Sequence, residues 1–272
     1  MLGAIADDLR LYRRLIGMQL RAQAQYKASL AIDIATYLTV TGMEFVALLI
    51  IFGSFPTLLG WRVGEVVLLY GLTSVSFGLA ELIGAGIDGF ADTIRRGDFD
   101  RVLLRPVGAF MQVIGSDFRL RRLSRITQGV IALALAPRLL PGLHWTVTRV
   151  AVAAVGVFSG AAVFVAILLL GATMCFWTVE TTELTNILTY GGCTLLSYPL
   201  TIYNRGLQRF FLAVVPLAFG SFVPACYVLD RALPFGLPPA LAFGAPIVAL
   251  IFASLSGAAW RVGVRHYQST GS

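Results

Sequence analysis

Residues 92–106 read DTIRRGDFDRVLLRP and place four arginines and three aspartates between long apolar runs. A charged side chain costs a few kcal/mol at the centre of a lipid bilayer, so a cluster this dense cannot lie in hydrocarbon. The segment has to face water between two membrane-spanning elements. This constraint decides how the rest of the chain is arranged.

The composition is that of a membrane protein. Of the 272 residues, 57% are hydrophobic and only 13% are charged, whereas soluble domains carry about 25% charged residues. Apolar runs long enough to span a bilayer recur, and the strand-like alternation of a β-barrel is not sustained. The sequence therefore predicts an all-α integral membrane protein with a single domain over residues 1–272.

The apolar runs predict about six transmembrane helices, at residues 34–53, 65–90, 124–141, 148–176, 186–203 and 240–260. Residues 1–30 are expected to form an interfacial helix, because arginines crowd one side of a helical apolar pattern. Residues 204–239 are interrupted by prolines, which favours an outer re-entrant hairpin before the last span. Residues 108–125 are interpreted as a cytoplasmic or interfacial helix, because they carry many charges.

The basic residues set the expected orientation. If the N-terminus is cytoplasmic, 15 of the 21 basic residues lie on the cytoplasmic side, among them Arg122 and Arg125, and six lie outside. The positive-inside rule then predicts that both termini are cytoplasmic. The net charge of +7 is interpreted as cytoplasmic arginine rather than as binding to nucleic acid.

The charged segment also predicts a short amphipathic helix, with Asp98 as its N-cap and Pro106 as its end. The apolar face of this helix carries Phe99, Val102 and Leu103. Arg101 and Arg105 form a basic pair on another face. A short helix of this kind between two spans is suited to docking a soluble partner.

Residues 96–106 resemble the R-x-G-x-hydrophobic-D-x-x-L-L-R-P loop of ABC-2-type transporter permeases. The nearest branch is bacterial and has paired permeases beside a separate ATPase. Weaker matches follow in the same order, at Phe52–Gly71, Tyr198-Pro199-Leu200, Val215-Pro216 and Pro224-Ala225. The resemblance covers the chain from about residue 30 onward.

The resemblance implies a permease subunit of an ATP-driven exporter in the bacterial inner membrane. Cargoes in this family include drugs, lipids and polysaccharides, and the uniformly apolar span 148–176 favours an amphipathic, drug-like or lipid-like cargo over an ion. The loop would be a coupling helix in a groove of the ATPase, formed by Asp98, Phe99, Arg101, Val102, Leu103 and Arg105. The complex would hold two ATPase subunits and a second permease, either a different paralogue or a second copy of this chain.

The sequence offers no catalytic motif of its own. It lacks G-x-x-x-x-G-K-[ST], the loop that cradles phosphates in many ATPases. ATP and Mg²⁺ are therefore expected on the partner ATPase, and this chain is expected to be neither an enzyme nor a cofactor-binding protein. The scattered residues Cys175, Cys193 and Cys226 do not have the spacing of a metal site.

Two carboxylates, Glu44 and Glu81, fall within predicted spans. An ionisable group inside a membrane is a candidate functional residue. Each could contact cargo in a translocation path, or each could make a buried polar contact between helices. A second hypothesis is a proton-coupled secondary transporter that uses Glu44 and Glu81, although the chain shows no clear inverted repeat.

Overall fold

The computed structural model describes residues 2–55, 57–105, 108–178 and 182–267, and most of them are helical. The strands in this part of the chain are β1 (Thr57–Leu58) and β2 (Trp61–Arg62), which pair in a small hairpin. The predicted all-α class is confirmed. Among the described residues, the segments long and apolar enough to cross a membrane are Lys27–Ser54, Val63–Ile83, Val147–Met174 and Pro239–His266.

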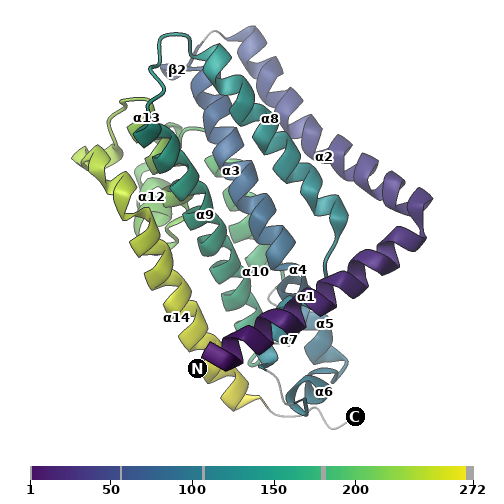
Figure 1. The fold of residues 1–272 in the computed structure, drawn as a ribbon. Helices are drawn as coiled ribbons and strands as arrows, with labels where there is room; N and C mark the ends of the chain where they lie inside the picture. The colour runs from purple at the N-terminus through teal and green to yellow at the C-terminus, as the bar shows by residue number, and fades with distance from the viewer. Residues whose placement is uncertain (1, 56, 106–107, 179–181, 268–272) are drawn as a thin grey trace.

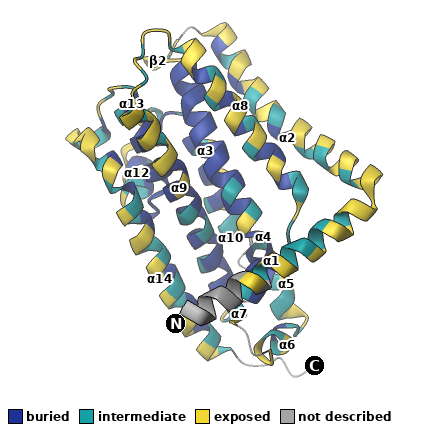
Figure 2. Cartoon of the chain, viewed as in Figure 1, coloured by how far each residue is buried: buried dark blue, intermediate teal, exposed yellow. Residues whose placement is uncertain are grey.

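Five long helices form a row (Figure 1). They are α2 (Lys27–Ser54), α8 (Leu123–Leu139), α3 (Val63–Ile83), α9 (Val147–Met174) and α14 (Ala245–His266). The helix α3 packs against both α8 and α9, and α9 packs in turn against α14. Buried residues therefore concentrate on α3, whereas α2 is mostly exposed (Figure 2). An α3 sequence that is apolar on all sides fits this central place.

Glycines allow two very close contacts between the elements. A Cβ atom on Gly71 of α3 would lie 3.1 Å from the carbonyl oxygen of Gly129 of α8. A Cβ atom on Gly220, in the short helix η5 (Leu217–Gly220), would lie 2.4 Å from the Cα atom of Gly160 of α9. These backbones can approach because both partners lack a side chain.

Two predicted spans are shorter helices. The helix α8 coincides with the predicted span 124–141 but has 17 residues, about 25 Å, against about 30 Å for the hydrocarbon core. The predicted span 186–203 overlaps α10 (Thr182–Asn186), the π-helix η2 (Ile187–Gly191) and α11 (Gly192–Leu196). A multi-pass chain is supported, and the count of six spans stays a prediction.

The connection between α3 and α8 forms one end of the bundle, which we call the loop end (Figure 1). It consists of α4 (Ala85–Asp88), α5 (Phe90–Arg95), α6 (Phe99–Leu103), α7 (Ala109–Ile114) and η1 (Leu120–Arg122). The helix α1 (Leu2–Gln25) packs on α7, and Gln19 Nε2 donates to the carbonyl oxygen of Ser116 at 2.9 Å. The interfacial position of α1 stays a prediction.

The other end of the bundle, which we call the hairpin end, carries the β-hairpin. The broken helices before α14 are η3 (Leu200–Ile202), α12 (Arg205–Arg209), the π-helix η4 (Phe210–Val214), η5, α13 (Phe222–Val228), η6 (Pro234–Gly236) and η7 (Pro239–Gly244). This agrees with the proline-broken pattern expected for 204–239. Re-entry of the segment into the membrane stays a prediction.

An arginine holds the hairpin end together. Arg231 Nη2 donates to Glu65 Oε2 and to the carbonyl oxygen of Gly60, both at 2.7 Å. Its guanidinium carbon also lies 4.4 Å from the ring centre of Trp61. Glu65 in turn accepts from the backbone N–H of Arg62, at the start of α3. One guanidinium thus links the β-hairpin, α3 and the segment that follows α13.

We expect the loop end and the hairpin end to lie on opposite sides of the membrane. In a chain whose cysteines at 175, 193 and 226 are replaced by alanine, Leu104→Cys should react with an impermeant thiol reagent from the cytoplasm. Leu104 is 85% exposed at the loop end. Thr57→Cys, at the hairpin end, should react only from outside, because the basic residues concentrate at the loop end. The measurement is labelling of vesicles of known orientation.

Arg265→Cys, near the end of α14, serves as the control and should be labelled from the same side as Leu104→Cys. Labelling of Thr57→Cys and Leu104→Cys from one side would contradict the arrangement. Glycines 60 and 97 are less suitable positions for this test, because both have a positive φ that strains a cysteine.

Candidate functional site

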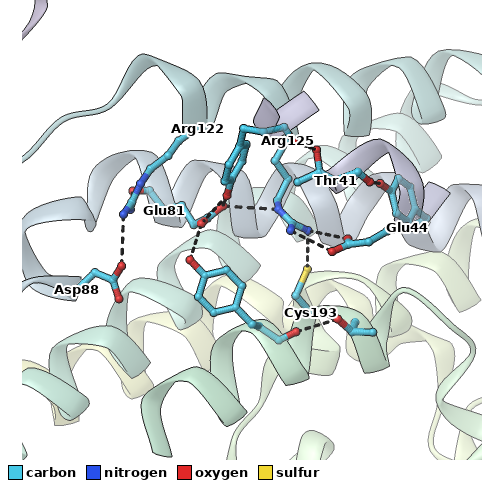
Figure 3. A network of polar contacts seen from close by, with 11 residues as sticks. Thr41, Glu44, Glu81, Asp88, Arg122, Arg125 and Cys193 are labelled. Carbon is cyan, nitrogen blue, oxygen red and sulfur yellow. Dashed lines mark hydrogen bonds and ion pairs between the residues drawn. The ribbon is translucent and has the colours of Figure 1, made fainter. Parts of the chain in front are cut away.

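Charged side chains meet inside the bundle towards its loop end (Figure 3). They come from separate elements, namely Glu44 of α2, Glu81 of α3, Asp88 of α4, Arg122 of η1 and Arg125 of α8. We call these five residues the charge network. It joins segments that are up to 81 positions apart in the sequence.

Arg125 is the centre of the charge network. Its side chain is 6% exposed, and its Nη1 and Nη2 atoms donate to the two carboxylate oxygens of Glu44 at 3.2 and 3.4 Å. Its Nε atom lies 3.6 Å from Glu81 Oε2. The guanidinium carbon is 5.3 Å from the ring centre of Phe77. A charge this deeply buried is tolerated only when it is paired, and Arg125 has a carboxylate on either side.

Glu81 is the most buried acid of the network, with a side chain that is 3% exposed. Its carboxylate accepts a hydrogen bond from the hydroxyl of Tyr37 at 2.8 Å and from that of Tyr190 at 2.9 Å. Its backbone carbonyl accepts from Arg122 Nη1, and Arg122 Nη2 donates to Asp88 Oδ2 at 3.3 Å. Both the carboxylate and the carbonyl of Glu81 thus connect neighbouring segments.

The sequence prediction missed both tyrosines that bind Glu81. Tyr37 lies on the α2 face that also carries Thr41 and Glu44, at positions i, i+4 and i+7, so helical spacing could have identified it. Tyr190 lies in the π-helix η2, whose wider turn changes the direction of its side chains. No local sequence pattern indicates that turn.

The structure places the predicted acids on either side of one arginine. Glu44 and Glu81 flank Arg125, and the Glu44 side chain is 41% exposed. Glu81 lies in the last turn of α3, close to the loop end. Arg122 and Arg125, which the sequence analysis placed on the cytoplasmic side, both point into the bundle and are buried. Their roles in transport stay predictions.

The charged loop of residues 92–106 differs from expectation at Phe99. This side chain is fully buried and lies in an aromatic cluster at the loop end. The other members of the aromatic cluster are Phe90, Phe176, Trp260 and Tyr267, whose ring centres lie 5.0 to 6.4 Å from that of Phe99. The expectation that Phe99 is an anchor exposed to a partner is therefore wrong, because this chain already covers it.

Asp98 also differs from expectation. It has helical dihedral angles, its side chain makes no capping hydrogen bond, and one carboxylate oxygen lies 3.5 Å from Arg101 Nη1. The helix α6 ends at Leu103 rather than near Arg105, and Pro106 lies outside the described residues.

Two leucines and two arginines at the end of the loop are exposed at the surface. Leu103 and Leu104 are 43% and 85% exposed, and Arg101 and Arg105 are exposed beside them. We call these four residues the loop tip. Val102 is half-buried against the aromatic cluster. The structure therefore turns two of the predicted apolar residues inward and leaves a leucine pair flanked by arginines in contact with solvent.

A family model described as ABC-2 family transporter protein matches residues 38–271, which include both the charge network and the loop tip. The chain belongs to the ABC-2 transporter family. It is thus a multi-pass membrane permease component of an ABC transporter, a family whose permeases associate with ABC ATPase subunits. Comparison of this permease with curated proteins and with solved structures gives no match.

The charge network predicts unequal effects of neutralising its members in the permease. Arg125→Met should lower the free energy of unfolding by about 3–5 kcal/mol, because Glu81 would stay buried without its cation. Glu44→Gln should cost less, because Glu44 is already partly exposed. The measurement is the thermal unfolding midpoint of the purified permease in detergent.

Arg138→Met is the matched control, since Arg138 is exposed on the same helix, α8. The double variant Arg125→Met, Glu81→Gln should recover part of the loss, because it removes the buried charge together with its partner. Equal unfolding midpoints for Arg125→Met and Arg138→Met would contradict a stabilising role for the network.

Proposed function

We propose that this permease is a subunit of an ATP-driven exporter of amphipathic, drug-like or lipid-like molecules in the bacterial inner membrane, with both termini in the cytoplasm. ATP and Mg²⁺ bind to a separate ATPase, which docks on the loop tip. The observation that carries the docking step is the exposed pair Leu103 and Leu104 between Arg101 and Arg105. Central apolar anchors with a charged rim are typical of small binding surfaces.

Two sets of contacts suit the transmission of movement from the loop tip into the bundle. Behind the loop tip, Phe99 packs on Phe176, which follows α9, and on Trp260 of α14. Nearer α3, Asp88 binds Arg122, which binds the carbonyl of Glu81. Packed rings and paired charges move as units. A push on the loop would therefore displace α9 and α14 through the aromatic cluster, and α2 through the charge network.

The scarcity of charged residues on the long helix α9 supports an amphipathic cargo. The described part of α9 beyond Arg149 carries no charged residue. Two permease chains, this one with a paralogue or with a second copy, and two ATPases would form the complete path. No observation favours the proton-coupled alternative: the Glu81 carboxylate is already bound by two hydroxyls and lies beside Arg125, as expected of a structural contact.

The loop tip and the aromatic cluster should respond differently to truncation. Leu104→Ala should reduce co-purification with the ATPase about tenfold or more, or uncouple ATP hydrolysis from transport, with an unchanged unfolding midpoint. Phe99→Ala should instead lower the free energy of unfolding by about 3–5 kcal/mol, because it opens a cavity in the aromatic cluster. Both variants are measured for ATPase binding, coupled hydrolysis and thermal unfolding.

Leu250→Ala, a change at an exposed leucine of α14, is the control and should alter neither ATPase binding nor coupling. If Leu103→Ala and Leu104→Ala both bind and couple like the unmodified permease, the loop tip is not the docking surface. A normal unfolding midpoint for Phe99→Ala would contradict the packing role of Phe99.

A further inference from the structure

A groove of about 630 Å³ opens on the surface of the bundle where α3, α9 and α14 meet. It lies in the half of the bundle nearer the loop end, since Trp260 and Phe110 of the loop-end packing close it there. The groove is separate from the charge network and from the loop tip, neither of which contributes a lining residue.

Small side chains line much of the groove. They are Ala161, Ala162 and Ala166 of α9, with Ala253 and Gly257 of α14. A Cβ atom added to Gly257 would meet no atom within 4 Å, so this position borders open space. The groove therefore has room for a slender apolar occupant that is not part of this chain.

The length of the groove matches one leaflet of a bilayer. Along α9 it extends from Phe158 to Leu169, which at 1.5 Å per residue is about 16 Å. Half of the hydrocarbon core is about 15 Å thick. The groove is therefore long enough to hold a lipid acyl chain from one leaflet.

A positive charge lies at the loop end of the groove. Arg261 lines it, and its Nε atom donates to the carbonyl oxygen of Gly257 at 3.2 Å. This bond turns the guanidinium back along α14 towards the groove. Among the described residues, no carboxylate forms an ion pair with Arg261. Basic sites between membrane helices, at the level of the lipid headgroups, are suited to anionic lipids.

We propose that this groove binds one acyl chain of an anionic phospholipid from the leaflet at the loop end, with the lipid phosphate on Arg261. The apolar walls contact the acyl chain, and the guanidinium binds the headgroup. A transmembrane helix of a second copy is a poorer fit, because it would bring no required anion to Arg261.

The test uses the full permease in phosphatidylcholine vesicles that contain phosphatidylglycerol with a photoactivatable acyl chain. After illumination, crosslinked peptides are mapped by mass spectrometry. The expected crosslinks concentrate on the groove faces of α9 and α14. A phosphatidylcholine analogue with the same photoactivatable chain should label these faces about tenfold less, because it lacks a net negative charge.

Two variants test the acyl-chain site and the headgroup site separately. Gly257→Leu should abolish groove labelling by filling the open space, and Arg261→Gln should remove the preference for phosphatidylglycerol. The matched controls are Gly53→Leu on α2, where a Cβ atom also meets nothing within 4 Å, and Arg265→Gln on α14. Both controls should keep the labelling of the unmodified permease.

Equal labelling by the two lipids, or unchanged preference in Arg261→Gln, would overturn the proposal. So would crosslinks spread evenly over all exposed helix faces. Labelling of a second copy across the groove would show instead that this face is an interface between chains. If Gly257→Leu does not fold, Arg261→Gln still tests the proposal, because Arg261 is exposed and its substitution should not disturb folding.

Discussion

A guanidinium buried among apolar helices has to be paired with carboxylates. The position of Arg125 therefore constrains how the helices of the loop-end half of the bundle pack. Glu44 of α2 and Glu81 of α3 form ion pairs with Arg125 from opposite sides. The helix α2 buries little of its own surface, so its position depends on polar contacts to a degree unusual for an apolar helix. Removing one partner of a buried pair costs more than the pair contributes, which makes the arrangement of α2, α3 and α8 mutually dependent.

The loop end combines two kinds of attachment that differ in their physics. The charge network is directional, because a guanidinium and a carboxylate must keep their distance and angle. The aromatic cluster around Phe99 depends on buried area and on ring geometry. Together they hold the buried side of the charged loop and leave the loop tip exposed at the surface. Fixing a short loop in this way lowers the entropy that docking would otherwise cost.

Much of the fold could be predicted from the sequence, because composition and run length report directly on burial in a membrane. The helices near 34–53, 65–90 and 148–176 and the charged connection between α3 and α8 are examples. Side-chain directions could not be predicted. Phe99 turns inward because Trp260 and Tyr267, far along the chain, meet it there. Arg125 points into the bundle for the same reason: its partners lie on other helices, which no local spacing reveals.

The separation of Glu44 from Arg125 has a consequence for biosynthesis. The two residues are 81 positions apart, and ribosomes add about 5–20 residues per second, so the arginine is made roughly 4–16 seconds after the glutamate. The carbonyl of Leu38, which accepts from Gln128 Nε2 at 2.7 Å, precedes its partner by 90 positions. The helix α2 is therefore synthesised well before Arg125 and Gln128, its partners on α8, exist. These contacts between α2 and α8 can form only after α8 has been synthesised.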